Sequence, residues 1–433
     1  MHPYEMSVAQ AVKDVHSGEL SARVLVESCL KRIAELDASI RAWARLCPEQ
    51  ALREADRIDQ TPVERKTRLP LAGVPFGVKD IFLTEGLETT AGSKILKGWV
   101  PTRDAVAVAR LRRAGAILLG KTATTEFASS DPAPTRNPVD LRHTPGGSSA
   151  GSGAAVAAQM CPAALGSQTA GSILRPAAYC GAVGFKPTYG AVSREGVLPL
   201  AWTMDHVGPI TRSVEDAALL FGQLVEPEGA RPRPGTGVLR VGIPDRYFDS
   251  AVPEVTCAIA RVCDSLPALG WRTAPISLPT SFELAMDGAL VILQAEIAAA
   301  HEDWFRRSRD DYGPKLRGLV ETGQKILASS YLRAQRIRRQ ATQEMSALFE
   351  HVDVLLTPTT PAPAPEGFAT TGDASYCWPF SCFGMPSLTL PVPAEGTQLP
   401  VGLQLVGNHG SDWALLDAGR SLELHVSGAK TRA

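Results

Sequence analysis

The chain carries two unusual neighbouring segments, TPGGSSAGSGAAVAA at residues 144–158 and GSQTAGSILRPAAYCGAVGFKPTYG at residues 166–190. In both, glycine and serine crowd around a short helix, expected at 150–159 and at 172–178. Glycine lets the backbone approach a ligand closely, and successive N–H groups in such a loop can bind an anion. These segments therefore predict a ligand-binding or catalytic loop.

Short apolar runs bounded by glycine and proline flank these segments, AGVPFGVKD at 72–80 and AILLG at 116–120, with a helical pattern between them. Towards the C-terminus, HVDVLL at 351–356 is typical of a buried strand, and 387–392 with 401–406 predicts a hairpin. Strands that alternate with helices form sheets covered on both faces. We expect an α/β fold with a central, mixed, mainly parallel and twisted sheet.

The whole chain, 1–433, is expected to form one domain without internal repeats. Apolar residues at helical spacing after Ser21 predict amphipathic N-terminal helices, and PEGARPRPGTG at 227–237 is typical of a linker or surface loop. The expected sections are N-terminal helices at 1–65, a catalytic core at 66–225, a mainly helical section at 238–350, and C-terminal strands, hairpin and helix at 351–433.

The composition is that of an ordinary globular protein. The 433 residues include 44 Lys and Arg against 45 Asp and Glu, a formal net charge of −1 that provides no overall field to hold nucleic acid or an anionic membrane. Arginines of the middle helices alternate with acidic residues, which favours ion-paired helix faces over RNA contact. The N-terminus lacks a secretion signal, and no apolar run is long enough to span a membrane. We expect a cytoplasmic protein with no nucleic-acid or membrane partner.

The eight cysteines are scattered without C-x-x-C or Cys/His spacing, which argues against a zinc site or a disulfide framework. The zincin, P-loop and dinucleotide-binding motifs are also missing from the sequence. We therefore expect neither a metal nor a cofactor.

Two short serine motifs are poor candidates for the catalytic site. The S-x-x-K match at 28–31 lies on an expected amphipathic helix and lacks its partner motifs. The G-x-S-x-G match centred on Ser149 follows Pro145 and two glycines, where a nucleophile elbow requires a strand.

A third pattern combines Lys79 in GVPFGVKD, the double serine Ser148 and Ser149, and Ser172, which follows Ser148 by 24 residues. Together these residues resemble the amidase signature family. Further segments that resemble the family's landmarks are GKTATTEF at 120–127, TRNP at 135–138, SREGVLPLAWTMDHVGP at 193–209 and LPVGLQLV at 399–406.

The resemblance implies a Ser172 nucleophile, a bridging Ser148 that follows a cis peptide bond, and a Lys79 base. A serine hydroxyl needs a base within hydrogen-bond reach, and a lysine with its usual pKa of about 10.4 is charged at neutral pH. Burial lowers the pKa of lysine, and the neighbours of Lys79 are apolar except Asp80, which would favour the charged form if it pointed inward. Taken one at a time, these residues have ordinary structural interpretations: Lys79 as a surface lysine, Ser148 as a turn residue and Ser172 as a helix N-cap. Their occurrence together, in this order, favours the catalytic interpretation.

The backbone N–H groups of Thr169, Ala170, Gly171 and Ser172 are expected to form the oxyanion hole. The family usually has two glycines before the nucleophile, whereas this chain has Ala170 and Gly171. The Cβ of Ala170 is tolerated only if its φ is negative.

Arg175 stands three residues after Ser172, as in the malonamidase-like branch of the family, where the arginine receives a substrate carboxylate. It either binds such a carboxylate or pins the loop through main-chain carbonyls, and the sequence leaves both open. Ala128, Ser129 and Trp378 are expected to line the substrate pocket, although the aromatic run around Trp378 also suits the core.

The resemblance thus implies hydrolysis of a small amide through an acyl-enzyme. Two alternatives remain open. One is a carbamate hydrolase with the same triad, because the same nucleophile accepts a urethane carbonyl. The other is a protein like the A subunit of an amidotransferase complex, which works together with partner chains. Whether the chain forms a homodimer is also open.

Overall fold

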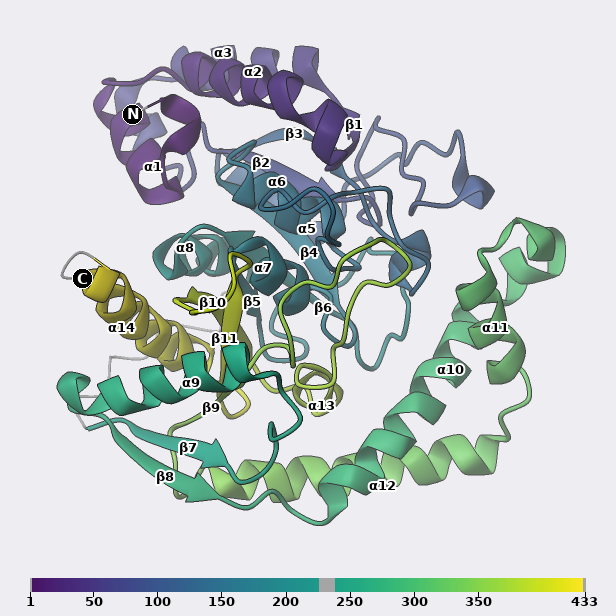
Figure 1. The fold of residues 1–433 in the computed structure, drawn as a ribbon. Coiled ribbons are helices and arrows are strands. Elements are labelled where there is room, and N and C mark those ends of the chain that lie inside the picture. The colour runs from purple at the N-terminus through teal and green to yellow at the C-terminus, as the bar shows by residue number, and fades with distance from the viewer. Residues whose placement is uncertain (1, 226–237, 431–433) are drawn as a thin grey trace.

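An eleven-stranded mixed sheet runs through the described residues, 2–225 and 238–430, of the computed structural model (Figure 1). The strand order is β1-β3-β2-β4-β6-β5-β10-β11-β9-β7-β8. The strands are β1 (Trp43–Leu46), β2 (Pro75–Lys79), β3 (Ile117–Thr122), β4 (Ala163–Gln168), β5 (Val183–Lys186), β6 (His206–Thr211), β7 (Arg240–Pro244), β8 (Arg272–Ile276), β9 (Val354–Pro358), β10 (Ser387–Val392) and β11 (Val401–Val406). The segment 227–237, where we expected a linker or loop, lies outside the described residues.

The expected mixed sheet is confirmed, but its parallel share is smaller than expected. Parallel pairs join β2 to β3 and β4, and β7 to β8 and β9, while the other six of the ten pairings among the described residues are antiparallel. The expected hairpin forms as β10 and β11, and it lies in the middle of the sheet between the two parallel regions. Strand β1 lies where we expected only helices. Its sequence, WARL, has no clear alternation, so its pairing with β3 depends on tertiary contact.

Serine caps begin several of the helices that cover the sheet. Ser7, Ser21 and Ser213 each accept a hydrogen bond from the backbone N–H three residues later, which satisfies a donor that a helix start leaves free. The α-helices are α1 (Val8–Ser17), α2 (Ala22–Ile40), α3 (Pro48–Asp59), α4 (Val63–Lys66), α5 (Val106–Arg113), α6 (Ala150–Ala157), α7 (Leu174–Cys180), α8 (Val214–Leu224), α9 (Pro253–Ser265), α10 (Ser281–Ser308), α11 (Pro314–Gly323), α12 (Ala328–Leu348), α13 (Trp378–Cys382) and α14 (Asp412–Lys430).

Side-chain alternation along β5 shows that helices cover both faces of the sheet. A Cβ built on Gly184 would lie 2.8 Å from Ala177 Cβ, so this face packs tightly against α7. The next residue, Phe185, points to the other face and stacks edge-on against Phe221 of α8 at 5.2 Å. Helix α14 packs on α8 and on β10. The central strands are therefore enclosed, as their burial requires.

Helices α10, α11 and α12 form a long helical arm at one side of the sheet (Figure 1). The carboxylate of Glu296 on α10, 1% exposed, ties this arm to the loop before β6 by accepting from Thr203 N at 2.9 Å and Thr203 Oγ1 at 2.6 Å. It also accepts from the Tyr331 hydroxyl of α12 at 2.8 Å. Within the described residues, no helix is long and apolar enough to cross a membrane.

Candidate active site

Lys79 ends strand β2 and is fully buried. Its Nζ lies 2.6 Å from Ser148 Oγ and 2.8 Å from the hydroxyl of Ser167, near the end of β4. Strands β2 and β4 are parallel neighbours, so their carboxyl ends bring these side chains to the same edge. Lys79 is therefore not a surface lysine.

Burial lowers the pKa of Lys79 well below its ordinary value of 10.5. The carboxylate of Asp205 opposes this shift, and the Arg175 guanidinium adds to it. The adjacent Asp80 points away from Lys79 and pairs with Lys121, with its Oδ1 3.2 Å from Lys121 Nζ. The condition under which Asp80 would keep Lys79 charged is thus not met.

The double serine lies between the lysine and the second glycine-rich segment. The peptide bond Gly147–Ser148 is cis, as the resemblance implied. Ser149 N donates to Ser172 O at 3.2 Å, and Ser149 Oγ donates to Ser167 O at 3.2 Å. These bonds hold Ser148 and Ser172 on neighbouring stretches of backbone. Among the hydrogen bonds of the described residues, none joins the Ser148 and Ser172 hydroxyls directly.

Ser172 lies in the turn before α7 and lines a cavity of about 500 Å³, named here the Ser172 cavity. Helix α7 begins at Leu174, two residues later than expected. The reason is the buried side chain of Gln168, whose Oε1 accepts from the N–H groups of Ile173 and Leu174 at 2.8 and 2.9 Å and holds the preceding residues in a loop. Ile173 occupies the N-cap position, so Ser172 is not the helix cap.

The loop 169–172 directs its carbonyls into the protein and leaves its N–H groups without acceptors. The hydroxyl of Ser381 donates to Ala170 O at 2.5 Å, and Arg175 N donates to Gly171 O at 2.8 Å. None of the N–H groups of residues 169–172 donates a hydrogen bond within the described part of the chain. Ala170 is not among the residues with positive φ, so the condition set for its Cβ is met.

The Ser172 cavity brings together Ala128, Ser129, Arg175 and Trp378, the four residues expected to bind substrate. Its lining includes the apolar side chains of Leu200, Leu290, Leu293, Ile297, Leu319 and Trp378. It also includes Lys315 and the loop 370–375. The Ser129 hydroxyl is buried and has no hydrogen-bond partner in the described part of the protein.

Arg175 is buried and held by main-chain oxygens. Its Nη2 and Nε donate to Gly147 O at 2.7 and 3.2 Å, and its Nη1 donates to Gly372 O at 2.6 Å. Burial lowers its pKa below the ordinary value. These contacts link helix α7 to the cis-peptide segment and to the loop 370–375, which also lines the cavity.

The family model described as Amidase matches residues 24–416. The chain belongs to the amidase family. The match therefore covers Lys79, Ser148 and Ser172 together with the fold around them.

Three relatives show how the family varies. The chain is 35% identical to the A subunit of glutamyl-tRNA(Gln) amidotransferase from Geobacter sp. (strain M21), over 98% of each chain. It is 34% identical to a solved chain described as part of a vestigial protein complex that reveals the origins of an s-triazine catabolic enzyme, with a TM-score of 0.89 over 96% of this chain and 98% of that one. It is 29% identical to the peptide amidase of Stenotrophomonas maltophilia, with a TM-score of 0.86 over 98% and 97% of the two chains.

Sequence reasoning missed two polar residues behind the amidase motifs, Ser167 and Asp205. Ser167 contacts Lys79, and Asp205 Oδ1 accepts from Thr169 Oγ1 at 2.5 Å. Asp205 also accepts from the N–H groups of Leu200 and Ala201, and burial raises its pKa to about 6. Both residues stand in segments that we had matched to the family, GSQTAGS and WTMDHVGP. Their position there was the only available signal.

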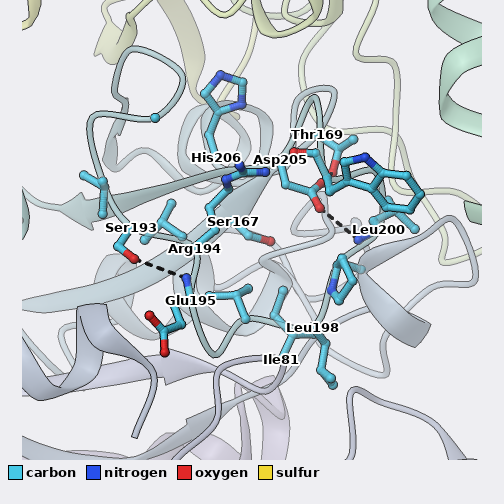
Figure 2. A pocket seen from close by; sticks show the side chains of 17 residues that line it. Ile81, Ser167, Thr169, Ser193, Arg194, Glu195, Leu198, Leu200, Asp205 and His206 are labelled. Carbon is cyan, nitrogen blue, oxygen red and sulfur yellow. Dashed lines mark hydrogen bonds between the residues drawn. The ribbon is translucent and has the colours of Figure 1, made fainter. Parts of the chain in front are cut away.

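A second cavity, of about 540 Å³, adjoins the first and is named here the Arg194 cavity (Figure 2). The two cavities share Ala128, Thr169 and Leu200 as lining residues. Ser167 lines the Arg194 cavity but not the Ser172 cavity. Figure 2 shows the Arg194 side chain reaching across the wall towards Asp205 and His206.

Proposed function

We propose that this member of the amidase family hydrolyses the C–N bond of a small amide through a Ser172 acyl-enzyme. The observation that carries the proposal is the buried Lys79 amine, 2.6 Å from Ser148 Oγ, beside a nucleophile loop whose N–H groups have no acceptor. A base of lowered pKa and free backbone donors are the two requirements of serine acyl transfer.

In the first step, Ser172 Oγ attacks the amide carbonyl carbon. The Ser172 proton passes to Ser148 as Ser148 gives its own proton to neutral Lys79, in a Ser–Lys form of triad catalysis. The negative charge that develops on the carbonyl oxygen is stabilised by the N–H groups of loop 169–172.

The tetrahedral intermediate then collapses as the C–N bond breaks. The proton returns from Lys79 through Ser148 to the leaving nitrogen, which departs as a neutral amine. A water molecule attacks the Ser172 ester by the same relay, and the carboxylic acid product leaves with Ser172 restored. The overall reaction consumes one water molecule and needs no further reactant.

The acyl half of the substrate belongs in the Ser172 cavity, whose aliphatic and aromatic wall favours an uncharged, apolar acyl group. Arg175 supports the loop in this proposal, because its contacts are all with main-chain oxygens. Comparing acidic and neutral acyl groups on wild type and Arg175→Lys tests this role. A preference for acidic acyl groups that Arg175→Lys abolishes would instead assign the carboxylate-binding role to Arg175.

The main experiment measures kcat/KM for an aryl amide and for the matched aryl carbamate, with Ser172→Ala as the blank. We expect the amide to be hydrolysed by wild type and neither substrate by the variant. Preference for the carbamate would make the chain a carbamate hydrolase with the same triad. Activity that survives in Ser172→Ala would refute the Ser172 mechanism.

A second candidate function is that of one component of a complex with partner chains. The observation that favours it is the 35% identity to the A subunit of an amidotransferase over 98% of both chains. The molar mass of the natively purified protein separates a monomer, a homodimer and a complex with other chains. If the isolated chain is inactive on amides and gains activity with co-purified partners, this second function holds and the first fails.

A further inference from the structure

Two cavities with mixed linings meet at the nucleophile loop. Leucines, Ile297 and Trp378 gather in the Ser172 cavity, together with the charged Arg175, Lys315 and Asp373, whereas the charged side chains of the Arg194 cavity are those of Arg194, Glu195 and Asp205. We infer that the Arg194 cavity receives the amine half of the substrate and that this half carries a carboxylate, which Arg194 binds. This inference rests on the proposed amide hydrolysis and names its leaving group.

The direction of proton transfer places the leaving nitrogen beside the second cavity. In the proposed reaction that nitrogen receives its proton from Lys79 through Ser148. The Ser167 hydroxyl, 2.8 Å from Lys79 Nζ, lines the Arg194 cavity and is absent from the wall of the other. An amide that spans the shared boundary, with its acyl group towards the leucines, therefore extends its amine group into the Arg194 cavity.

Arg194 has the chemistry to bind a carboxylate. Its guanidinium donates to Trp202 O and lies over the ring of Tyr189, 4.6 Å from the ring centre. No carboxylate of the described residues lies within ion-pair distance of it. The remaining N–H groups of a guanidinium suit the planar oxygens of a carboxylate.

The other titratable groups of this cavity are acidic or neutral. Glu195 pairs with Arg103 at 2.9 Å, on the exposed side. Asp205 accepts from the loop residue Thr169 and from backbone N–H groups, and the charge of Arg194, beyond ion-pair distance, lowers its pKa against the larger effect of burial. Burial lowers the pKa of His206 well below its ordinary value, so its ring is neutral, and its Nδ1 lies 3.1 Å from Gln168 O. Arg194 is thus the cation in this lining that is left for an anionic ligand.

The two cavities together define a substrate class, an amide between an apolar carboxylic acid and an amine that carries a carboxylate. N-Hexanoylglycine is a probe of this class, and N-hexanoylisobutylamine is its neutral isostere. We expect wild type to prefer the glycine conjugate by at least about tenfold in kcat/KM, the range of one charge-assisted hydrogen-bond pair. Arg194→Gln should remove this preference, whereas Arg194→Lys should keep part of it.

Arg306→Gln is the matched control, because Arg306 is exposed, pairs with Asp303 on α10 and lines neither cavity. It should keep the preference of wild type. Equal losses on both probes in Arg194→Gln would show a structural role for Arg194 and overturn the inference. If Arg194→Gln fails to fold, the wild-type enzyme still tests the inference. A kcat/KM for the glycine conjugate that is equal to or below that for the neutral amide overturns it.

An ester with the same acyl group separates this inference from the proposed function. p-Nitrophenyl hexanoate reports acylation of Ser172 without an amine half, with Ser172→Ala as the blank. Turnover of the ester without preference for the glycine conjugate overturns the inference and leaves the proposed function standing. If the ester and both amides are inert, the proposed function fails, and the inference fails with it.

Discussion

Lys79 can act as a base only in its neutral form, and Asp205 is the carboxylate that opposes this form. Below the folded-state pKa of Lys79 the amine is protonated, so activity falls on the acidic side of the pH profile. Asp205→Asn removes the charge that raises this pKa and should move the acidic limb of kcat/KM to lower pH. The measurement is kcat/KM from pH 5 to 10. An exposed control, Asp303→Asn, should leave the limb in place, and an unmoved limb in Asp205→Asn would contradict the assignment.

Gly171 is required by close approach and not by its φ. A Cβ at this position would lie 2.9 Å from Ala374 Cβ and 3.2 Å from Cys377 Cβ, so Gly171→Ala must displace the loop. We expect kcat to fall by about 10²-fold, the effect of losing one oxyanion donor. The reverse change beside it, Ala170→Gly, should leave kcat nearly unchanged. Steady-state kinetics on the aryl amide check both, and a nearly active Gly171→Ala enzyme would argue against this oxyanion loop.

At the scale of single residues, sequence motifs indicated Lys79, Ser148 and Ser172, because residue type and order were enough to match a family pattern. The partners Ser167 and Asp205 could not be identified in the same way. Their roles arise from the edge where β2 and β4 end beside the loop that precedes β6, and residue order alone does not specify which side chains meet there.

At the scale of elements, the start of α11 is capped by carboxylates from the loop that lines the Ser172 cavity. Asp131 accepts from Lys315 N at 3.2 Å and Leu316 N at 2.8 Å, and Glu126 accepts from Gly313 N at 2.7 Å. Asp131→Ala should lower the free energy of unfolding by about 1 kcal/mol, as loss of a helix cap does.

The same variant should also raise KM for the hexanoyl probes, because the cavity residues 128–130 lie between the two capping carboxylates. Urea unfolding and steady-state kinetics measure the two effects. Asp303→Ala, which removes an exposed ion pair on α10, serves as the control and should change neither quantity. If Asp131→Ala lowers stability but leaves KM unchanged, the capping contacts do not determine the shape of the Ser172 cavity.

Glu423 joins α14 to the start of α8 by accepting from Val214 N at 3.0 Å. Burial raises its pKa to about 7, so the ionised form is disfavoured in the folded state and stability falls as pH rises from about 4.5 through 7. Glu423→Gln keeps an acceptor without the charge. It should raise Tm at pH 8 and have less effect at pH 5. Thermal unfolding at both pH values tests this, and an equal shift at both would exclude titration as the cause.

At the scale of the whole molecule, the buried carboxylate of Glu296 is one of the contacts that tie the helical arm to the catalytic core. Removing Glu296 leaves the partly buried Thr203 N and Tyr331 hydroxyl without this acceptor, and loss of each hydrogen bond to a charged group costs about 1–2 kcal/mol. Glu296→Ala should therefore lose at least about 2 kcal/mol of unfolding free energy in urea. Tyr331→Phe, which removes one donor and keeps the ring, should lose about 1 kcal/mol. If Glu296→Ala and Tyr331→Phe lower the unfolding free energy equally, the loss comes from side-chain packing and not from the hydrogen bonds of Glu296.

The α/β class and the mixed sheet were predictable from strands that alternate with helices, and hydrophobic spacing after the Ser21 cap indicated the N-terminal helices. Strand order was not predictable. The pairing of β10 with β5 joins Ser387 to Lys186, far apart in the sequence, and such pairings depend on which edges remain free once other strands are in place.

That same pairing has a consequence for the making of the protein on the ribosome. Strand β5 is translated about two hundred residues before the strand that covers its edge. During synthesis this half of the sheet therefore presents an open edge, the surface from which chains aggregate. Ser381, which holds the nucleophile loop through Ala170 O, also emerges in this late segment. A nascent chain accordingly carries every residue of the proposed triad well before it can assemble a working site.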